Sequence, residues 1–141
     1  MSMRSLDFDN GIRTFAINGD ESNVIRVSVS DANMMARYEN AKTRLDEIAE
    51  KFRESDEGGE SLAEALTLGD RELRSVIDCI FGDDTSEHAF GGVNCLSAVS
   101  GGRFLFEAFL EALIPEIARE VESFAAARAE RYTAEVIGET K

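Results

Sequence analysis

The chain has 141 residues, of which 15 are basic and 28 acidic, so its formal net charge is −13. This charge repels nucleic-acid phosphates and anionic lipid surfaces, and it argues against direct binding to nucleic acid or to a membrane. With 43% hydrophobic and 30% charged residues, the composition predicts a single domain over residues 1–141 that buries a core of its own.

Long apolar stretches are absent from the sequence. Arg4, Asp7 and Asp9 interrupt the first residues, which argues against an apolar signal-peptide core there. No segment reaches the roughly 18 uncharged apolar residues that a membrane-spanning helix requires. Cys79 and Cys95 are the only cysteines, and we interpret them as two buried small hydrophobes, with a disulfide as the alternative. We therefore expect a cytoplasmic protein with reduced thiols.

Residues 1–29 alternate apolar and polar side chains, which is typical of β-strands. The pair Asn10-Gly11 indicates a hairpin, because a type I′ turn needs positive φ at both central residues. A two-residue turn at that pair would bring four apolar side chains to one face of the sheet, namely Leu6, Phe8, Phe15 and Ile17.

A third strand is expected from Val24 to Val29, with Ile25 and Val27 on its apolar side. For this strand to share the face of the first two, the loop beginning at Asn18-Gly19 must hold an odd number of residues, three or five instead of two, because a shift of one inverts a strand. The sequence thus predicts a three-stranded antiparallel meander that needs a helix on its apolar face.

Residues 30–54 carry apolar side chains at steps of four and three, which places them in one seam along a helix. Such a seam suits packing against another helix, and we interpret it as a recognition surface. The small side chain of Ala41 leaves ordinary core packing as the alternative. The seam consists of Met34, Tyr38, Ala41, Leu45, Ile48 and Phe52.

A second helix is expected over residues 60–81, with a possible break at Gly69, and the glycine-rich stretch 82–102 is expected to be a long loop. The last helix is expected over 103–133. Pro115 within it lacks an N–H donor, which predicts a kink or a fresh helix start. The whole pattern predicts an α+β fold, a small antiparallel meander of three strands followed by three to four α-helices.

No catalytic constellation accompanies these elements. His88 is the sole histidine and has no evident nucleophile beside it; Cys95, in the same stretch, leaves a small cysteine–histidine hydrolase as an alternative. Asp83, Asp84 and Glu87 lack the spacing of a calcium-binding loop, and one histidine with two cysteines does not supply a zinc site. We therefore expect no enzymatic activity, no metal and no other cofactor.

Acidic residues are concentrated between Glu54 and Glu87, where eleven of them accompany only Arg71 and Arg74. A solvated face is the simpler interpretation, because charge runs on helix exteriors are common. The alternative is a lure for a basic partner. An acidic protein of that kind would mimic DNA and inhibit a nucleic-acid-binding protein.

The order of elements and three short motifs resemble small tail-assembly proteins of tailed phages and prophages in Gram-positive bacteria. The longest motif is a helix that ends in a Phe-Gly pair and is followed by a turn containing Thr and Ser, with a strongly apolar helix further on. The motifs are Leu6–Gly11, Phe15–Gly19 and Val76–Gly92.

This resemblance implies a tail assembly chaperone, a non-enzymatic factor that shields the coiled-coil tape-measure protein and brings tail-tube subunits to it without entering the virion. The last helix has more apolar width than the rest of the chain can readily cover, so we also expect a homo-oligomer whose client helices compete for the same surface. The partner-binding residues expected on this basis are Phe104, Phe106, Phe109, Leu113, Ile117 and Phe124.

Overall fold

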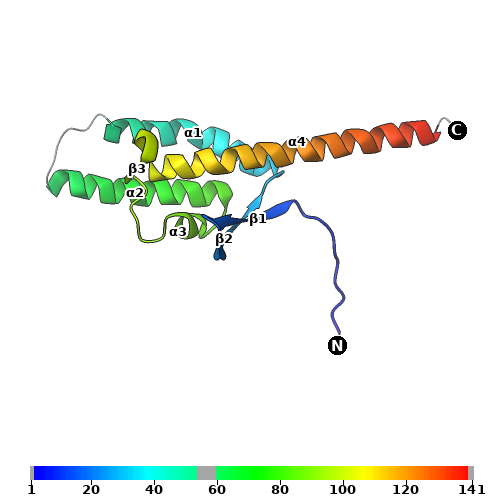
Figure 1. Ribbon diagram of the computed structural model, residues 1–141, viewed down its shortest axis with the longest axis horizontal. Helices are drawn as coiled ribbons and strands as arrows, with labels where there is room; N and C mark the ends of the chain where they lie inside the picture. The colour runs from blue at the N-terminus through cyan, green and yellow to red at the C-terminus, as the bar shows by residue number, and fades with distance from the viewer. Residues whose placement is uncertain (1, 54–59, 140–141) are drawn as a thin grey trace.

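The computed structural model describes residues 2–53 and 60–139, and it combines helices with two small antiparallel sheets (Figure 1). The expected α+β class is confirmed in this form. In chain order the elements are β1 (Ile12–Ile17), β2 (Asp20–Ser28), α1 (Ala32–Arg53), α2 (Glu60–Phe81), α3 (Thr85–Phe90), β3 (Ala98–Val99), the 3₁₀ turn η1 (Ser100–Gly102), β4 (Arg103–Phe104) and α4 (Leu105–Glu139).

The three-stranded meander is wrong, because residues 2–10 form no strand; we call this segment the N-terminal arm. In Figure 1 the arm runs away from the helical body to the N-terminus. A two-residue turn at Asn10-Gly11 would need the Ile12 N–H to bond the carbonyl of Asp9. Instead that N–H donates to Asn10 Oδ1 at 3.1 Å, and the Gly11 N–H donates to Asp9 Oδ1 at 2.9 Å.

The hairpin turn lies at Asn18-Gly19, where φ is 50° and 78°, as a type I′ turn requires. The expected three- or five-residue loop is therefore wrong. A register shift follows the turn, since Ile17 pairs with Asp20 but Ala16 pairs with Val24. The three residues of β2 inserted by this shift change which face of β2 meets β1.

The predicted apolar face of the hairpin survives because of this shift. Phe15 pairs with Ile25, and Arg13 pairs with Val27. Ile25 and Val27 are buried, and Phe15 packs against the same core. The expectation that an odd number of extra residues brings Phe15 and Ile25 to one face was therefore correct. These residues lie in a bulge of β2 instead of in the turn.

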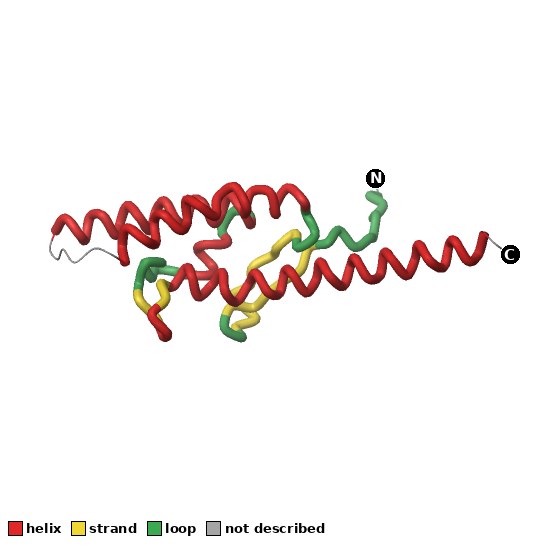
Figure 2. The backbone as a smooth tube through the Cα atoms, turned by 90° about the horizontal axis from the view of Figure 1, so that it is seen from above, coloured by secondary structure: helices red, strands yellow, loops and turns green. Residues whose placement is uncertain are grey.

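The helices α1 and α2 run antiparallel, and their bounds lie close to the expected ranges 30–54 and 60–81 (Figures 1 and 2). The helix α2 is continuous through Gly69, so the expected break does not occur. A Cβ at Gly69 would lie 2.8 Å from Leu96 Cδ1 and 2.9 Å from Phe52 Cε2. The glycine therefore permits close packing at this point and does not end the helix.

The apolar seam of α1 belongs to the core. Met34, Leu45 and Ile48 are buried, and the other three members pack against the same cluster, so the interpretation as an exposed recognition surface is wrong. The chain provides its own partner helix, because α2 covers the seam. The largest fully buried side chains of the core are Phe106, Met34, Leu73, Ile77, Ile80, Ile117, Val27, Val29 and Cys95.

The stretch 82–102 is not one long irregular loop, because it contains α3, β3 and η1. The start of α3 is attached to α2, since Asp78 accepts hydrogen bonds from the Ser86 N–H at 2.8 Å and from the Ser86 hydroxyl at 2.9 Å. The short helix α3 contacts α2, β2 and α4. It therefore joins the hairpin to the helices.

A single helix, α4, passes through Pro115, and the expected fresh helix start there is wrong. The expected kink is wrong as well, since α4 shows no sharp bend in either view (Figures 1 and 2). Both Pro115 and Glu111 are exposed, so the Glu111 carbonyl that lacks a helical donor faces solvent. The second half of α4 projects beyond the other elements.

Within the described residues, no helix combines the length and the apolar character needed to cross a membrane.

The register of the hairpin can be tested by a pair of neighbouring substitutions. Ile25→Ala should lower the free energy of unfolding by about 2 to 4 kcal/mol, because it removes a buried side chain. Arg26→Ala, on the exposed face, should change it by less than about 0.5 kcal/mol. Urea denaturation measures both, and equal effects would contradict the register.

The position of Pro115 inside a continuous helix predicts that Pro115→Ala stabilises the protein. Alanine restores the missing N–H donor and removes the clash with the preceding turn, and the gain should be about 1 to 2 kcal/mol. Thermal and urea unfolding measure this change. A loss of stability would indicate instead that Pro115 begins a separate helix.

Candidate functional site: an apolar groove between β1 and α4

An apolar groove of about 380 Å³ lies between β1 and α4, and we call it the β1–α4 groove. Phe15–Asn18 and Ile25 of β2 line one side, so the groove takes in the edge of β1 as well as the face that the hairpin turns toward α4. One face of α4 forms the opposite wall, and α3 closes the groove with Ala89 and Phe90. The residues contributed by α4 are Leu105, Ala108, Phe109, Ala112, Leu113 and Glu116.

Small side chains on α4 open the groove. Ala108 and Ala112 are one helical turn apart and line the same wall. Next to them, the ring of Phe109 makes edge-on contacts with Phe90 at 5.6 Å and with Phe81 at 6.3 Å between ring centroids. These contacts hold the Phe109 ring in one orientation. The Phe109 ring is therefore a fixed part of the groove wall.

Arg13 attaches β1 to α4 beyond the groove. Its guanidinium lies 3.6 Å from a carboxylate oxygen of Glu120 and 5.0 Å from the ring centroid of Phe124. The same guanidinium donates two hydrogen bonds to Asp9, at 2.9 and 3.0 Å. These bonds, with one from the Gly11 N–H, lower the pKa of Asp9 to about 2. Arg13 thus connects the N-terminal arm, the strand and the last helix.

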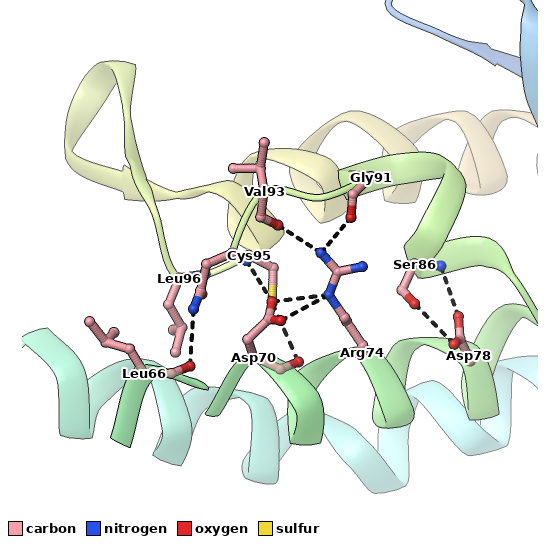
Figure 3. Close-up of polar contacts among 10 residues, drawn as sticks. Leu66, Asp70, Arg74, Asp78, Ser86, Gly91, Val93, Cys95 and Leu96 are labelled. Carbon is pink, nitrogen blue, oxygen red and sulfur yellow. Dashed lines mark hydrogen bonds and ion pairs between the residues drawn. The ribbon is translucent and has the colours of Figure 1, made fainter. Parts of the chain in front are cut away.

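A polar network attaches the glycine-rich segment to α2 (Figure 3). Asp70 accepts hydrogen bonds from Arg74 Nε at 3.0 Å and from the Cys95 N–H at 2.8 Å. Arg74 Nη2 donates to the carbonyls of Gly91 at 2.9 Å and Val93 at 2.7 Å. Partial burial raises the pKa of Asp70, but the hydrogen bonds from Cys95 and Arg74 outweigh this and lower it below its ordinary value.

The network also fixes the chain that leads into α4. Asn94 Nδ2 donates to the Leu66 carbonyl at 3.1 Å, and Asn94 Oδ1 accepts from the Leu96 N–H at 2.8 Å. The Phe106 N–H donates to the Cys95 carbonyl at 3.0 Å. The first turn of α4, and with it one end of the groove, is therefore held by backbone bonds to a segment anchored on α2.

The geometry does not support the cysteine–histidine hydrolase. Cys95 is fully buried, and burial raises the pKa of its thiol far above the ordinary value, so the thiol remains protonated. His88 lies on α3 with Nδ1 2.8 Å from Asn23 Oδ1, and Asn23 Nδ2 donates to the His88 carbonyl at 2.9 Å. Both cysteines are free, and Cys79 is exposed, which corrects the expectation that both are buried.

Acidic side chains of the 54–87 stretch divide into two groups. Glu54, Asp56 and Glu57 lie outside the described residues. Among those described, Glu72 accepts a hydrogen bond from Arg44 Nε at 2.7 Å, and Asp70 and Asp78 bind groups of this chain as described above. No cluster of three or more histidine, cysteine or acidic residues in the ranges 2–53 and 60–139 could hold a metal ion.

The six residues expected to bind a partner do not form one surface. Phe106, Leu113 and Ile117 are buried in the core of the chain, while Phe104, Phe109 and Phe124 are partly buried. Of the six, only Phe109 and Leu113 line the β1–α4 groove. Sequence reasoning missed the alanines of the groove, for which the signal was a pair of small residues one turn apart. It also missed Phe15 and Ile17 as lining residues.

The polar network predicts that Arg74→Ala lowers the free energy of unfolding by about 1 to 3 kcal/mol, because two loop carbonyls lose a donor and Asp70 loses its cation. Arg119→Ala is the control, since the Arg119–Glu116 pair is exposed and should contribute less than about 0.5 kcal/mol. Chemical denaturation compares the two variants.

The pH dependence of stability provides a second measurement on this network. The pKa of Asp70 is lower in the folded state than its ordinary value of 3.8. Its contribution is therefore complete above that ordinary value and is lost as the pH falls through the lower, folded value. In the Asp70→Asn variant the free energy of unfolding should fall less steeply as the pH is lowered. An unchanged pH dependence below the ordinary pKa would contradict the lowered pKa of Asp70.

Comparison with known proteins places the chain in a family. Residues 19–135 match the model of the family of unknown function DUF6673. The matched region holds β2, the helices α1 to α3 and the α4 wall of the groove, while the N-terminal arm and β1 precede it. Searches of curated proteins and of solved structures find no match. Because the matched region covers most of the chain, the chain belongs to the DUF6673 family.

Proposed function

We propose that this protein is a non-enzymatic tail assembly chaperone of a phage or prophage of Gram-positive bacteria, acting in the cytoplasm of the host cell. Its clients are the tape-measure protein and the tail-tube subunits, and it does not become part of the virion. The observation that carries the proposal is the β1–α4 groove, an open apolar groove in a strongly acidic protein. The sequence resemblance described above supports the choice of client.

A groove of this form can receive the apolar stripe of a client helix. Ala108 and Ala112 leave room for bulky side chains at helical spacing, and Phe15 and Phe109 present apolar surface on both sides. Each Leu or Phe side chain of the client that becomes buried there contributes roughly 1.5 to 3 kcal/mol. Several such contacts along one stripe are enough for reversible binding.

The charge of the protein fits the same role. A tape-measure protein exposes long apolar stripes before the tail assembles, and such surfaces aggregate. Binding a protein of net charge −13 covers part of the stripe and adds negative charge to the complex, which keeps neighbouring complexes apart. The same charge disfavours contact with DNA or RNA.

The groove can be tested by co-expression with the tape-measure protein encoded in the same genome. We expect the wild-type chain to keep the tape-measure protein in the soluble fraction and to co-purify with it. Ala112→Glu should abolish co-purification, because it places a charge in the apolar groove.

The matched control is Ala118→Glu, an exposed alanine on the same helix that does not line the groove. It should bind the client as the wild type does. Equal binding by both variants would contradict the role of the groove, and a wild-type chain that fails to retain the tape-measure protein would contradict the proposed function. A salt-sensitive complex with a basic nucleic-acid-binding protein would favour the DNA-mimic alternative instead.

A further inference from the structure

The N-terminal arm carries two large apolar side chains that nothing in the described part of the chain covers. Leu6 is 87% exposed and Phe8 is 76% exposed. They alternate with Asp7 and Asp9, which is the pattern of a strand with one apolar and one polar face. Apolar residues in such a pattern on an extended segment indicate a strand that pairs elsewhere.

The contacts at the junction of the N-terminal arm and β1 direct the arm away from its own sheet. Asp9 binds the Arg13 guanidinium through both carboxylate oxygens and also accepts a hydrogen bond from the Gly11 N–H. If the arm folded back through Asn10-Gly11, Asp9 would pair with Ile12, and its side chain would lie on the face opposite to Arg13. The Asp9–Arg13 contact and a folded-back arm therefore exclude each other.

The edge of β1 that does not pair with β2 can accept an added strand. In the described residues β1 pairs only with β2, and no backbone hydrogen bond reaches its other edge along Phe15–Ile17. The β1–α4 groove follows that same edge. A strand added there places alternate side chains into the groove and the intervening ones toward solvent.

We propose that two copies of this chain exchange their N-terminal arms. The segment Ser5–Asp9 of each copy adds to the β1 edge of the other, with Leu6 and Phe8 in the groove and Asp7 outside. Five extended residues span about 17 Å, similar to the length of the six-residue strand β1. The exchange is reciprocal, so both arms and both grooves are used and the assembly closes as a dimer.

This exchange and the proposed function share one groove. The arms cover the grooves when no client is present, and a client helix displaces them. Client binding and dimerisation therefore compete, but the exchange does not depend on what the client is. Its test needs only the protein itself.

Sedimentation velocity at micromolar concentration tests the exchange. We expect the wild-type chain to sediment as a dimer and Phe8→Asp to sediment as a monomer. Met3→Asp is the matched control, since Met3 is 99% exposed in the same arm but is out of phase with Leu6 and Phe8. It should remain a dimer. Neither residue belongs to the core, so circular dichroism should show the same fold for both variants.

A mixing experiment distinguishes arm exchange from other dimers. Phe8→Asp has a defective arm and an intact groove, and Ala112→Glu has an intact arm and a defective groove. Each should be monomeric alone, while an equimolar mixture should form a heterodimer through one arm. A monomeric wild type, a dimer that survives Phe8→Asp, or a mixture that stays monomeric would each overturn the exchange.

The same variants keep this proposal separate from the chaperone function. Phe8→Asp retains its groove and should still co-purify with the tape-measure protein, with no weaker binding than the wild type, because it no longer competes with an arm. A wild-type dimer that ignores the tape-measure protein would contradict the chaperone function alone. A chain that binds the tape-measure protein but never dimerises would contradict the exchange alone.

Discussion

The structure depends on how much of α4 the rest of the chain can bury. Phe106, Leu113 and Ile117 form one stripe that is buried against the core. The apolar surface of α4 is wider than this stripe, because Leu105 and Phe109 lie beside it. A two-stranded hairpin is too small to cover the remainder. The uncovered apolar surface between β1 and α4 is the groove, and because exposed apolar surface is unfavourable in water, this is the surface on which both proposals rest.

Polar contacts hold one end of the groove in place. The ion pair of Asp70 and Arg74 lies partly buried on α2, where it is screened less than a surface pair, and it satisfies the carbonyls of Gly91 and Val93 as well as the Cys95 N–H. A glycine-rich segment without these bonds would keep its conformational entropy. Because these bonds hold the glycine-rich segment in place, the segment sets the position of α3 and of the first turn of α4, which form part of the groove wall.

Local patterns predicted α1 and α2 well, and the reason is physical. The 3.6-residue periodicity of apolar side chains acts within each helix, and it requires no knowledge of the partner. The prediction was wrong about what the apolar seam of α1 contacts, because the seam packs against α2 of the same chain. The sequence likewise indicated that α4 is too apolar for one partner, but it did not indicate which residues remain at the surface. That depends on the elements packed against each face.

The sequence by itself determined the α+β class, the two central helices and the shared apolar face of Phe15 and Ile25. Only the tertiary structure decided which of two Asn-Gly pairs closes the hairpin. Both pairs consist of residue types that tolerate positive φ, but among the described residues only Asn18 and Gly19 adopt it together. At Asn10-Gly11, however, the side chains of Asp9 and Asn10 take the N–H groups, and Asp9 is held by Arg13. Arg13 is itself positioned by Glu120 and Phe124 on α4, more than a hundred residues away, so no local pattern could show it.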